Sequence, residues 1–230
     1  MTTGSILGEA WGLYKSHWRH LLPIALVFYL VISGIALLLG LTLGIAGALI
    51  GAALAFIGVF LLQGALTEAV ADVRDGRADL SIGDTFSRVV PVLGVLIAAS
   101  ILAAIGIMLG LVLLVVPGLV LLTWWSLIVP AIVLEKAGVL QSFGRSRQLV
   151  RGHGWMVFGV IIVTILILIV ARGLIAVALI WLPEELRSFG SDLIGGTLTT
   201  PFSAIAWTVM YFRLRATEPA AEAATEPRVL

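Results

Sequence analysis

The sequence predicts an all-α, polytopic membrane protein, and three observations carry the prediction. Of its 230 residues 60% are hydrophobic and 12% are charged, whereas soluble domains carry about 25% charged residues. Several apolar runs reach the roughly 20 residues that a helix needs to cross a bilayer. Short amphipathic, basic segments separate these runs into pairs. We therefore expect one integral membrane domain over residues 1–216, with about six transmembrane helices and three short amphipathic cytoplasmic helices.

The first amphipathic helix is expected over about residues 5–20. Leu7, Trp11, Tyr14 and Trp18 recur at helical spacing and form one apolar face. Because tryptophan beside basic residues suits the headgroup layer of a membrane, Trp11 and Trp18 are predicted to contact lipid or a partner protein. The alternative is a helix packed on the protein itself.

The charge-free stretch over residues 21–66 is too long for one span. A break near residues 42–47 predicts a tight hairpin between spans over 21–42 and 46–68. Glycines on both sides of this break have GxxxG spacing, which lets helix backbones approach closely. We expect them to serve packing inside the monomer, with a dimer interface as the alternative.

The second unit begins with a short amphipathic helix that starts near Ser81. Pro91 then opens a third span over 92–114. A turn at residues 116–118, Val-Pro-Gly, leads into a fourth span over 118–135. The third unit repeats this order and starts near Val139.

The third amphipathic segment, residues 138–152, is named here the basic elbow. Its Arg145, Arg147 and Arg151, with Trp155 just beyond it, are predicted to contact anionic phospholipid or a cytoplasmic partner. Spans over 155–182 and 191–212 follow, and the Ala/Glu/Pro-rich residues 217–230 are expected to form a disordered cytoplasmic tail.

The distribution of basic residues predicts the orientation of the chain. Twelve Lys and Arg residues fall on the side of the termini and the three amphipathic helices, against Arg187 alone on the other side. Since cytoplasmic loops carry the excess of Lys and Arg, both termini are expected in the cytoplasm. Arginine far outnumbers lysine, which favours a bacterial protein and hence the inner membrane.

Arg172 is the one charged residue within a predicted span. It can reach the outer headgroups with its long side chain, or it can mark a functional site. Pro201 leaves the carbonyl of Thr197 without its helical hydrogen bond, and counting residues about the turn at 185 places Arg172 near it. Arg172 and Thr197 are therefore the candidate intramembrane polar site. Pro130 frees the carbonyl of Ser126 in the same way.

The sequence contains no sign of catalysis. It has no cysteine, its three histidines lack metal-ligand spacing, and it has neither a nucleophile elbow nor a phosphate-binding loop. We expect no enzymatic activity, no metal and no cofactor. Nucleic-acid binding is not expected either, because topology explains the basic residues.

Several residues around the basic elbow form a motif, namely Pro130-Ala131, Glu135, Arg145-Ser146, Leu149, Arg151-Gly152 and Trp155. This motif resembles the membrane domain found in glycerophosphoryl diester phosphodiesterases and in related bacterial integral membrane proteins. Residues 6–22 and 211–215 are similar to the two ends of that domain, and Ser142 stands where the family often has alanine. The resemblance implies about six spans. It implies no phosphodiesterase activity, since in the enzymes that chemistry belongs to a separate soluble barrel.

Three functions are compatible with these features. The first is a non-enzymatic scaffold or partner subunit whose amphipathic helices rest on anionic lipid or on a cytoplasmic protein. The second is a small transporter or lipid-handling permease with a cavity near Arg172, Pro130 and Pro201. The third is a membrane-embedded lipid enzyme. A polar cavity at mid-depth would favour the second over the first.

Overall fold

The computed structural model describes residues 2–76 and 80–218, and this part of the chain is helical and without strands. The elements are α1 (Thr3–Arg74), α2 (Ile82–Val89), η1 (Val90–Val92), α3 (Leu93–Leu113), α4 (Val115–Trp124), α5 (Ile128–Glu135), α6 (Val139–Val150), α7 (Gly154–Ala178), α8 (Glu184–Gly190), η2 (Ser191–Gly195) and α9 (Gly196–Arg215). Five segments are long and apolar enough to cross a membrane, and the first of them, α1, folds back on itself. The protein is thus an all-α polytopic membrane protein, as its composition predicts.

Helix α1 contains two breaks. They divide it into an amphipathic segment before His17, a first long arm between His17 and Gly44, and a second long arm after Gly44. The backbone leaves helical geometry at His17 (φ −120°, ψ 18°) and at Gly44 (φ 57°, ψ −135°). A positive φ of this kind is accessible to glycine at little cost, and Gly44 lies inside the predicted hairpin. The helix begins at Thr3, two residues before the predicted start, because the Thr2 hydroxyl accepts a hydrogen bond from the Ser5 amide at 3.3 Å.

The two arms of α1 pack closely through glycine next to the hairpin. A Cβ atom added at Gly47 would lie 1.8 Å from the Leu39 carbonyl oxygen, and one at Gly51 would lie 2.9 Å from the Ala36 Cα. By contrast, a Cβ at Gly40 would meet open space. Gly47 and Gly51 therefore hold the arms together inside the monomer, which is the role expected of the GxxxG spacing.

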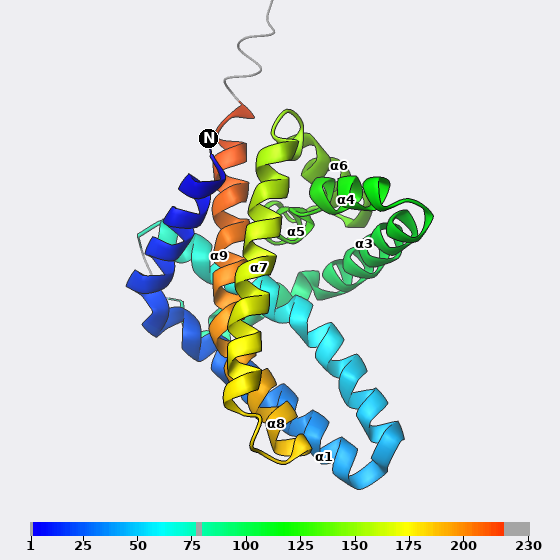
Figure 1. Cartoon of the computed structure of the whole chain (residues 1–230). Coiled ribbons are helices and arrows are strands. Elements are labelled where there is room, and N and C mark those ends of the chain that lie inside the picture. The colour runs from blue at the N-terminus through cyan, green and yellow to red at the C-terminus, as the bar shows by residue number, and fades with distance from the viewer. Residues whose placement is uncertain (1, 77–79, 219–230) are drawn as a thin grey trace, which may run out of the picture.

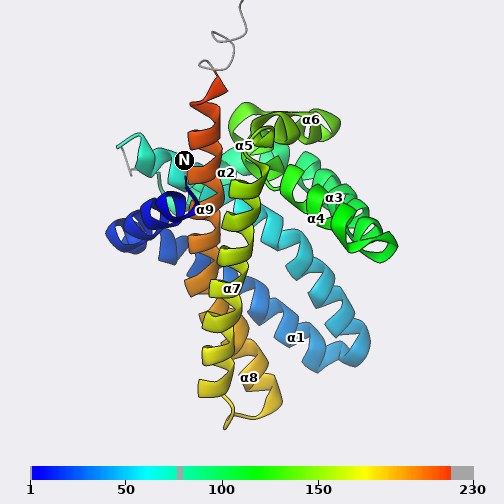
Figure 2. The ribbon, with the colours of Figure 1, turned by 45° about the horizontal axis from the view of Figure 1, so that its top comes forward.

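Helix α9 lies at the centre of the molecule, against α1 and α7 (Figures 1 and 2). In the membrane-length segment Leu186–Arg215, which contains α9, 78% of an apolar 18-residue stretch is buried, against 39% or less in the other four segments. The N-terminus, α6 and the end of α9 lie at one end of the molecule, and the α1 hairpin and α8 lie at the other (Figure 1). The three amphipathic segments and the two helix hairpins that follow α2 and α6 keep the predicted order.

The helix bounds differ from the predicted spans at several ends. The second arm, predicted over 46–68, continues to Arg74, whose guanidinium lies over the Phe212 ring at 4.8 Å and pairs with Glu9 at 3.7 Å. The helix predicted to begin at residue 191 already begins at Glu184 and passes through the π-helical turn η2 into α9. The predicted fifth span over 155–182 ends earlier, with α7 at Ala178.

The fourth span, predicted as one helix over 118–135, is two helices. It begins at Val115, since the chain reverses at Leu114 (φ −158°, ψ 130°) and Pro117 is tolerated in the first helical turn. It then breaks at residues 125–127, between α4 and α5. Pro130 explains the break because its ring clashes with the carbonyl four residues earlier and offers no amide hydrogen to it.

The chain is also ordered slightly further than predicted at its C-terminal end. Disorder was expected from Thr217, but Thr217 donates a hydrogen bond to the Leu214 carbonyl and Glu218 pairs with Arg145. The remaining residues of the predicted tail lie outside the described ranges.

Candidate functional site

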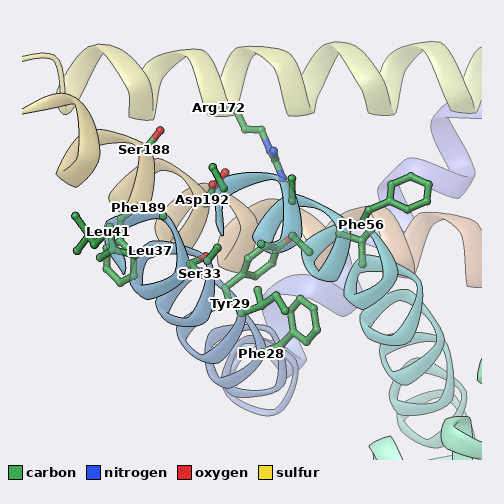
Figure 3. A pocket seen from close by; sticks show the side chains of 18 residues that line it. Phe28, Tyr29, Ser33, Leu37, Leu41, Phe56, Arg172, Ser188, Phe189 and Asp192 are labelled. Atoms are coloured by element: carbon green, nitrogen blue, oxygen red, sulfur yellow. The ribbon is translucent and has the colours of Figure 1, made fainter. Parts of the chain in front are cut away.

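A groove of about 770 Å³ lies between the two arms of α1 and the segment formed by α7, α8 and η2 (Figure 3). We call it the α1–α7 groove. Most of its wall is apolar and comes from α1 between Phe28 and Val59. Arg172, Ser188, Phe189 and Asp192 complete it from the other side. The groove is thus an apolar trough with a small polar region at one wall.

Arg172 projects from α7 toward η2, and Asp192 lies beside it (Figure 3). Its Nε donates a hydrogen bond to Thr199 Oγ1 at 3.3 Å, and that hydroxyl in turn donates to the Gly195 carbonyl at 2.6 Å. Within the described residues, this is the hydrogen bond that Arg172 makes, so the predicted contact with Thr197 is wrong by two residues. The count assumed two straight helices that meet at residue 185, whereas α7 ends at Ala178, the next helix begins at Glu184, and the π-helical turn η2 precedes α9.

The predicted partner, Thr197, faces the protein interior instead. The residue is 8% exposed, and its hydroxyl has no hydrogen-bond partner among the described residues. A side chain does reach the backbone of α9 in this turn, but it is the Tyr14 hydroxyl, which donates to the Leu198 carbonyl at 3.0 Å. The sequence thus predicted the turn of α9 that accepts a side-chain hydrogen bond, but it predicted Arg172 and Thr197 as the partners instead of Tyr14 and Leu198.

Further polar contacts tie both arms of α1 to α9. The hydroxyls of Tyr29 and Thr200 lie 2.8 Å apart, and Gln63 Nε2 donates to Ser203 Oγ at 3.4 Å. A Cβ at Gly196 would lie 2.3 Å from the Tyr29 ring, so the ring packs directly on the backbone of α9. These contacts were missed from the sequence, although the run of Thr and Ser in α9 was a signal for them.

At the other end of the molecule, Arg145 of the basic elbow is held between two carboxylates. Its Nε donates to both carboxylate oxygens of Glu135, at 3.0 and 2.7 Å, and its two terminal nitrogens donate to Glu218, one of them at 2.8 Å. The hydrogen bonds with Glu218 and Glu135 raise the pKa of Arg145 above its ordinary value, so it stays charged. Tyr211 also donates to Glu135, at 2.6 Å. Arg145 was predicted to face lipid or a partner, whereas its hydrogen bonds are used within the chain.

Ser146 closes the break between α4 and α5. Its hydroxyl donates to the Trp124 carbonyl at 2.7 Å and accepts from the Leu127 amide at 3.0 Å, and both Ser146 and Leu127 are fully buried. The side chain thus replaces two backbone contacts at the break, three and six residues before Pro130. The residues that carry the family resemblance are largely the ones that build the basic elbow.

Replacing Ser146 with alanine is expected to lower the free energy of unfolding by about 1–3 kcal/mol, because two buried backbone groups would lose their partner. Ser142 is the matched control, since it is also fully buried in α6 but donates only to Val139 of its own helix, at 2.6 Å. Ser142→Ala should cost less than Ser146→Ala in thermal unfolding measured in mild detergent. Equal losses for the two variants would show that Ser146 does not hold the break.

The remaining predicted contact residues are exposed. Trp11, Trp18 and Trp155 are 51%, 47% and 88% exposed, and Arg147 and Arg151 also lie at the surface. Trp11 nonetheless stacks on Tyr14 at 5.6 Å between ring centroids, so one face of it packs on the protein. The other four remain available to lipid or to a partner.

The groove and the helices around it define a polytopic membrane protein with an open, mostly apolar trough between its helices. No family model, curated protein or solved structure matches the chain. Among residues 2–76 and 80–218, no three His, Asp or Glu side chains gather in a way that could hold a metal ion.

Proposed function

We propose that this protein binds a membrane lipid in the α1–α7 groove and acts by binding rather than by catalysis. The observation that carries the proposal is the groove itself, whose volume of about 770 Å³ falls in the usual range of ligand sites. Wall residues such as Leu41 and Ala52 are exposed, so a lipid has lateral access to it. Of the functions weighed from the sequence, this is nearest to the lipid-handling one, although its cavity was expected to be polar and to lie near Pro130 and Pro201 as well as Arg172. The groove is mostly apolar, and of these three residues it is lined by Arg172 alone.

The polar wall supports an anionic lipid as the ligand. A charged side chain within a membrane segment is costly and is placed where it meets a polar partner or a ligand. Arg172 uses its Nε on Thr199 and makes no ion pair with a carboxylate among the described residues, although Asp192 stands beside it (Figure 3). A guanidinium still has donors for a phosphate or carboxylate oxygen after one such bond.

Filling the groove tests this function. Ala52 lines the groove and the adjacent Ala53 is exposed outside it. Ala52→Trp should reduce the lipid retained after purification in mild detergent about tenfold, a cost in line with overpacking, whereas Ala53→Trp should leave it unchanged. Native mass spectrometry measures the retained lipid. If both variants keep the lipid of the natural chain, the groove is not its site and the scaffold function is favoured.

We also propose that the termini and the three amphipathic segments face the cytoplasm of a bacterial cell, with the chain in the inner membrane. The distribution of Lys and Arg supports this orientation, and the N-terminus and the end of α9 lie at the same end of the fold (Figure 1).

Because the chain has no cysteine, single cysteines report its orientation directly. A cysteine at Leu140, which is 75% exposed on α6, should react with an impermeant thiol reagent only after cell lysis. One at the exposed Ser188 of α8 should react in intact cells. Labelling of the Leu140 variant without lysis would reverse the proposed orientation.

Kinship with the membrane domain of the glycerophosphoryl diester phosphodiesterase type also remains a proposal. Its support is that Pro130, Glu135, Arg145 and Ser146, which carry the resemblance, interact around one broken helix. Such a group of interacting residues is expected of a structural motif that a family shares.

A further inference from the structure

A basic pocket of about 450 Å³ lies beside the basic elbow. It is lined by Trp124, Gly144, Arg147, Gln148 and Arg151, and it is separate from the α1–α7 groove. Two guanidinium groups line it and no carboxylate does. Its chemistry is therefore that of an anion site.

Arg147 is held in place at this pocket by an aromatic ring. Its guanidinium carbon lies 4.3 Å from the centroid of the Trp124 ring, and the Trp124 carbonyl is fixed in turn by Ser146 at 2.7 Å. Stacking uses the flat face of a guanidinium and leaves the N–H groups along its edge free to donate. Arg147 is thus oriented before any ligand arrives, which lowers the entropic cost of binding one.

The pocket arginines differ from the neighbouring basic residues in their partners. Arg145 pairs with Glu135 and Glu218, Lys136 with Glu68, and Arg213 with Glu9. In the part of the chain that the structure describes, neither Arg147 nor Arg151 makes an ion pair. They stand four residues apart on α6 and its C-cap, a spacing at which like charges repel. An anion between them would relieve that repulsion.

The surroundings of the pocket indicate where the anion comes from. Trp155, four residues beyond Arg151, is 88% exposed at the start of α7, and exposed tryptophan at the end of a membrane helix marks the headgroup layer. Gly152, with a φ of 83°, makes the turn between the pocket and that helix. The pocket thus opens at the level where phospholipid phosphates lie.

We infer that the pocket formed by Trp124, Arg147, Gln148 and Arg151 binds the phosphate of an anionic phospholipid headgroup. Arg147 and Arg151 donate to the phosphate oxygens, and Gln148 offers an amide donor beside them. Arg145, predicted from the sequence to share this role, is excluded because all three of its side-chain nitrogens are engaged by Glu135 and Glu218. The site is independent of the groove, so either can fail without the other.

The test compares two double variants that remove the same charge. Arg147→Gln with Arg151→Gln removes both pocket cations, and Lys15→Gln with Arg19→Gln removes two exposed cations that also stand over tryptophan rings, at 5.9 and 5.6 Å. Delipidated protein in detergent is titrated with phosphatidylglycerol or with phosphatidylcholine, and bound lipid is counted by native mass spectrometry. Every protein carries Ala52→Trp, so that the groove is filled in each.

Each Arg near an anionic surface is worth about fivefold in affinity, so the pocket variant, which loses two, should bind phosphatidylglycerol at least tenfold more weakly. The Lys15/Arg19 variant should change less than threefold, and phosphatidylcholine binding should not differ between them. Equal losses in the two double variants would overturn the inference in favour of general surface charge. So would full competition by inorganic phosphate at equal concentration, which would make the site one for the free anion.

A lysine variant separates a loss of lipid binding from a loss of folding. Arg147→Lys keeps the charge but lacks the flat guanidinium that stacks on Trp124. It should weaken phosphatidylglycerol binding by an intermediate amount without lowering the melting temperature. Affinity equal to that of the natural chain would show that stacking does not shape the site.

Discussion

Gly47→Ala is expected to lower the free energy of unfolding by about 3 kcal/mol, the upper end of what overpacking usually costs. The added Cβ would lie 1.8 Å from the Leu39 carbonyl oxygen and 2.9 Å from the Leu43 Cβ. The first of these atoms belongs to the backbone of the opposite arm, which cannot rotate away as a side chain can. The arms of α1 would have to separate, and the hairpin would lose its close packing.

Gly40→Ala is the matched control for this change, because a Cβ there meets nothing within 4 Å. In a helix interior alanine is preferred to glycine by up to about 1 kcal/mol, so the control should be neutral or stabilising. Melting temperatures in the same detergent compare the two, and Gly47→Ala should lie lower by roughly 10 °C. Equal melting temperatures would mean that the two arms do not touch at the hairpin.

Arg145→Ala is expected to cost about 3 kcal/mol for a different reason. It leaves Glu135 and Glu218, which are 20% and 30% exposed, without the cation between them. Removing one member of a largely buried ion pair costs about 3–5 kcal/mol because the other charge stays desolvated, and partial exposure places this case at the lower end. The C-terminal end of α9 should loosen from α6 as well.

The control for Arg145→Ala is Arg147→Ala, two residues away on the same helix. Arg147 stacks on Trp124 and has no carboxylate partner in the described chain, so its loss should cost about 1 kcal/mol or less. Thermal unfolding of both variants, together with Glu135→Gln and the Arg145→Ala/Glu135→Gln double variant, gives the coupling energy of the pair. A coupling energy near zero would show that the ion pair between Arg145 and Glu135 does not stabilise the basic elbow.

Much of the fold could be predicted from the sequence because hydrophobic length and glycine act locally. Gly44 forms the hairpin inside the predicted break, and Pro130 breaks the fourth span at the carbonyl that it was predicted to free. Each of these effects depends on a few neighbouring residues. The group that satisfies the break, Ser146, lies some 20 residues further along the chain and could not be identified in that way.

The candidate site was less predictable, because it depends on contacts between distant segments. Glu218 reaches Arg145 across 73 residues, and Tyr14 reaches Leu198 across 184. Arg172 could be singled out as a charge within a span, but its partner is Thr199 and not Thr197, because the chain between α7 and α9 is not two straight helices that meet at residue 185. The groove itself results from how the arms of α1 lie against α7 and η2, which no local pattern encodes.

Photocrosslinking is the most direct test of the central claim, that the α1–α7 groove holds a lipid. Cells would be supplied with a fatty acid that carries a photoreactive group in its chain, and the protein purified in mild detergent so that only retained lipid remains. After irradiation, peptide mass spectrometry should find adducts mainly between Phe28 and Val59 and near Phe189. Adducts spread evenly over the exposed faces of α3, α4 and α7, with none enriched in the groove, would contradict the claim.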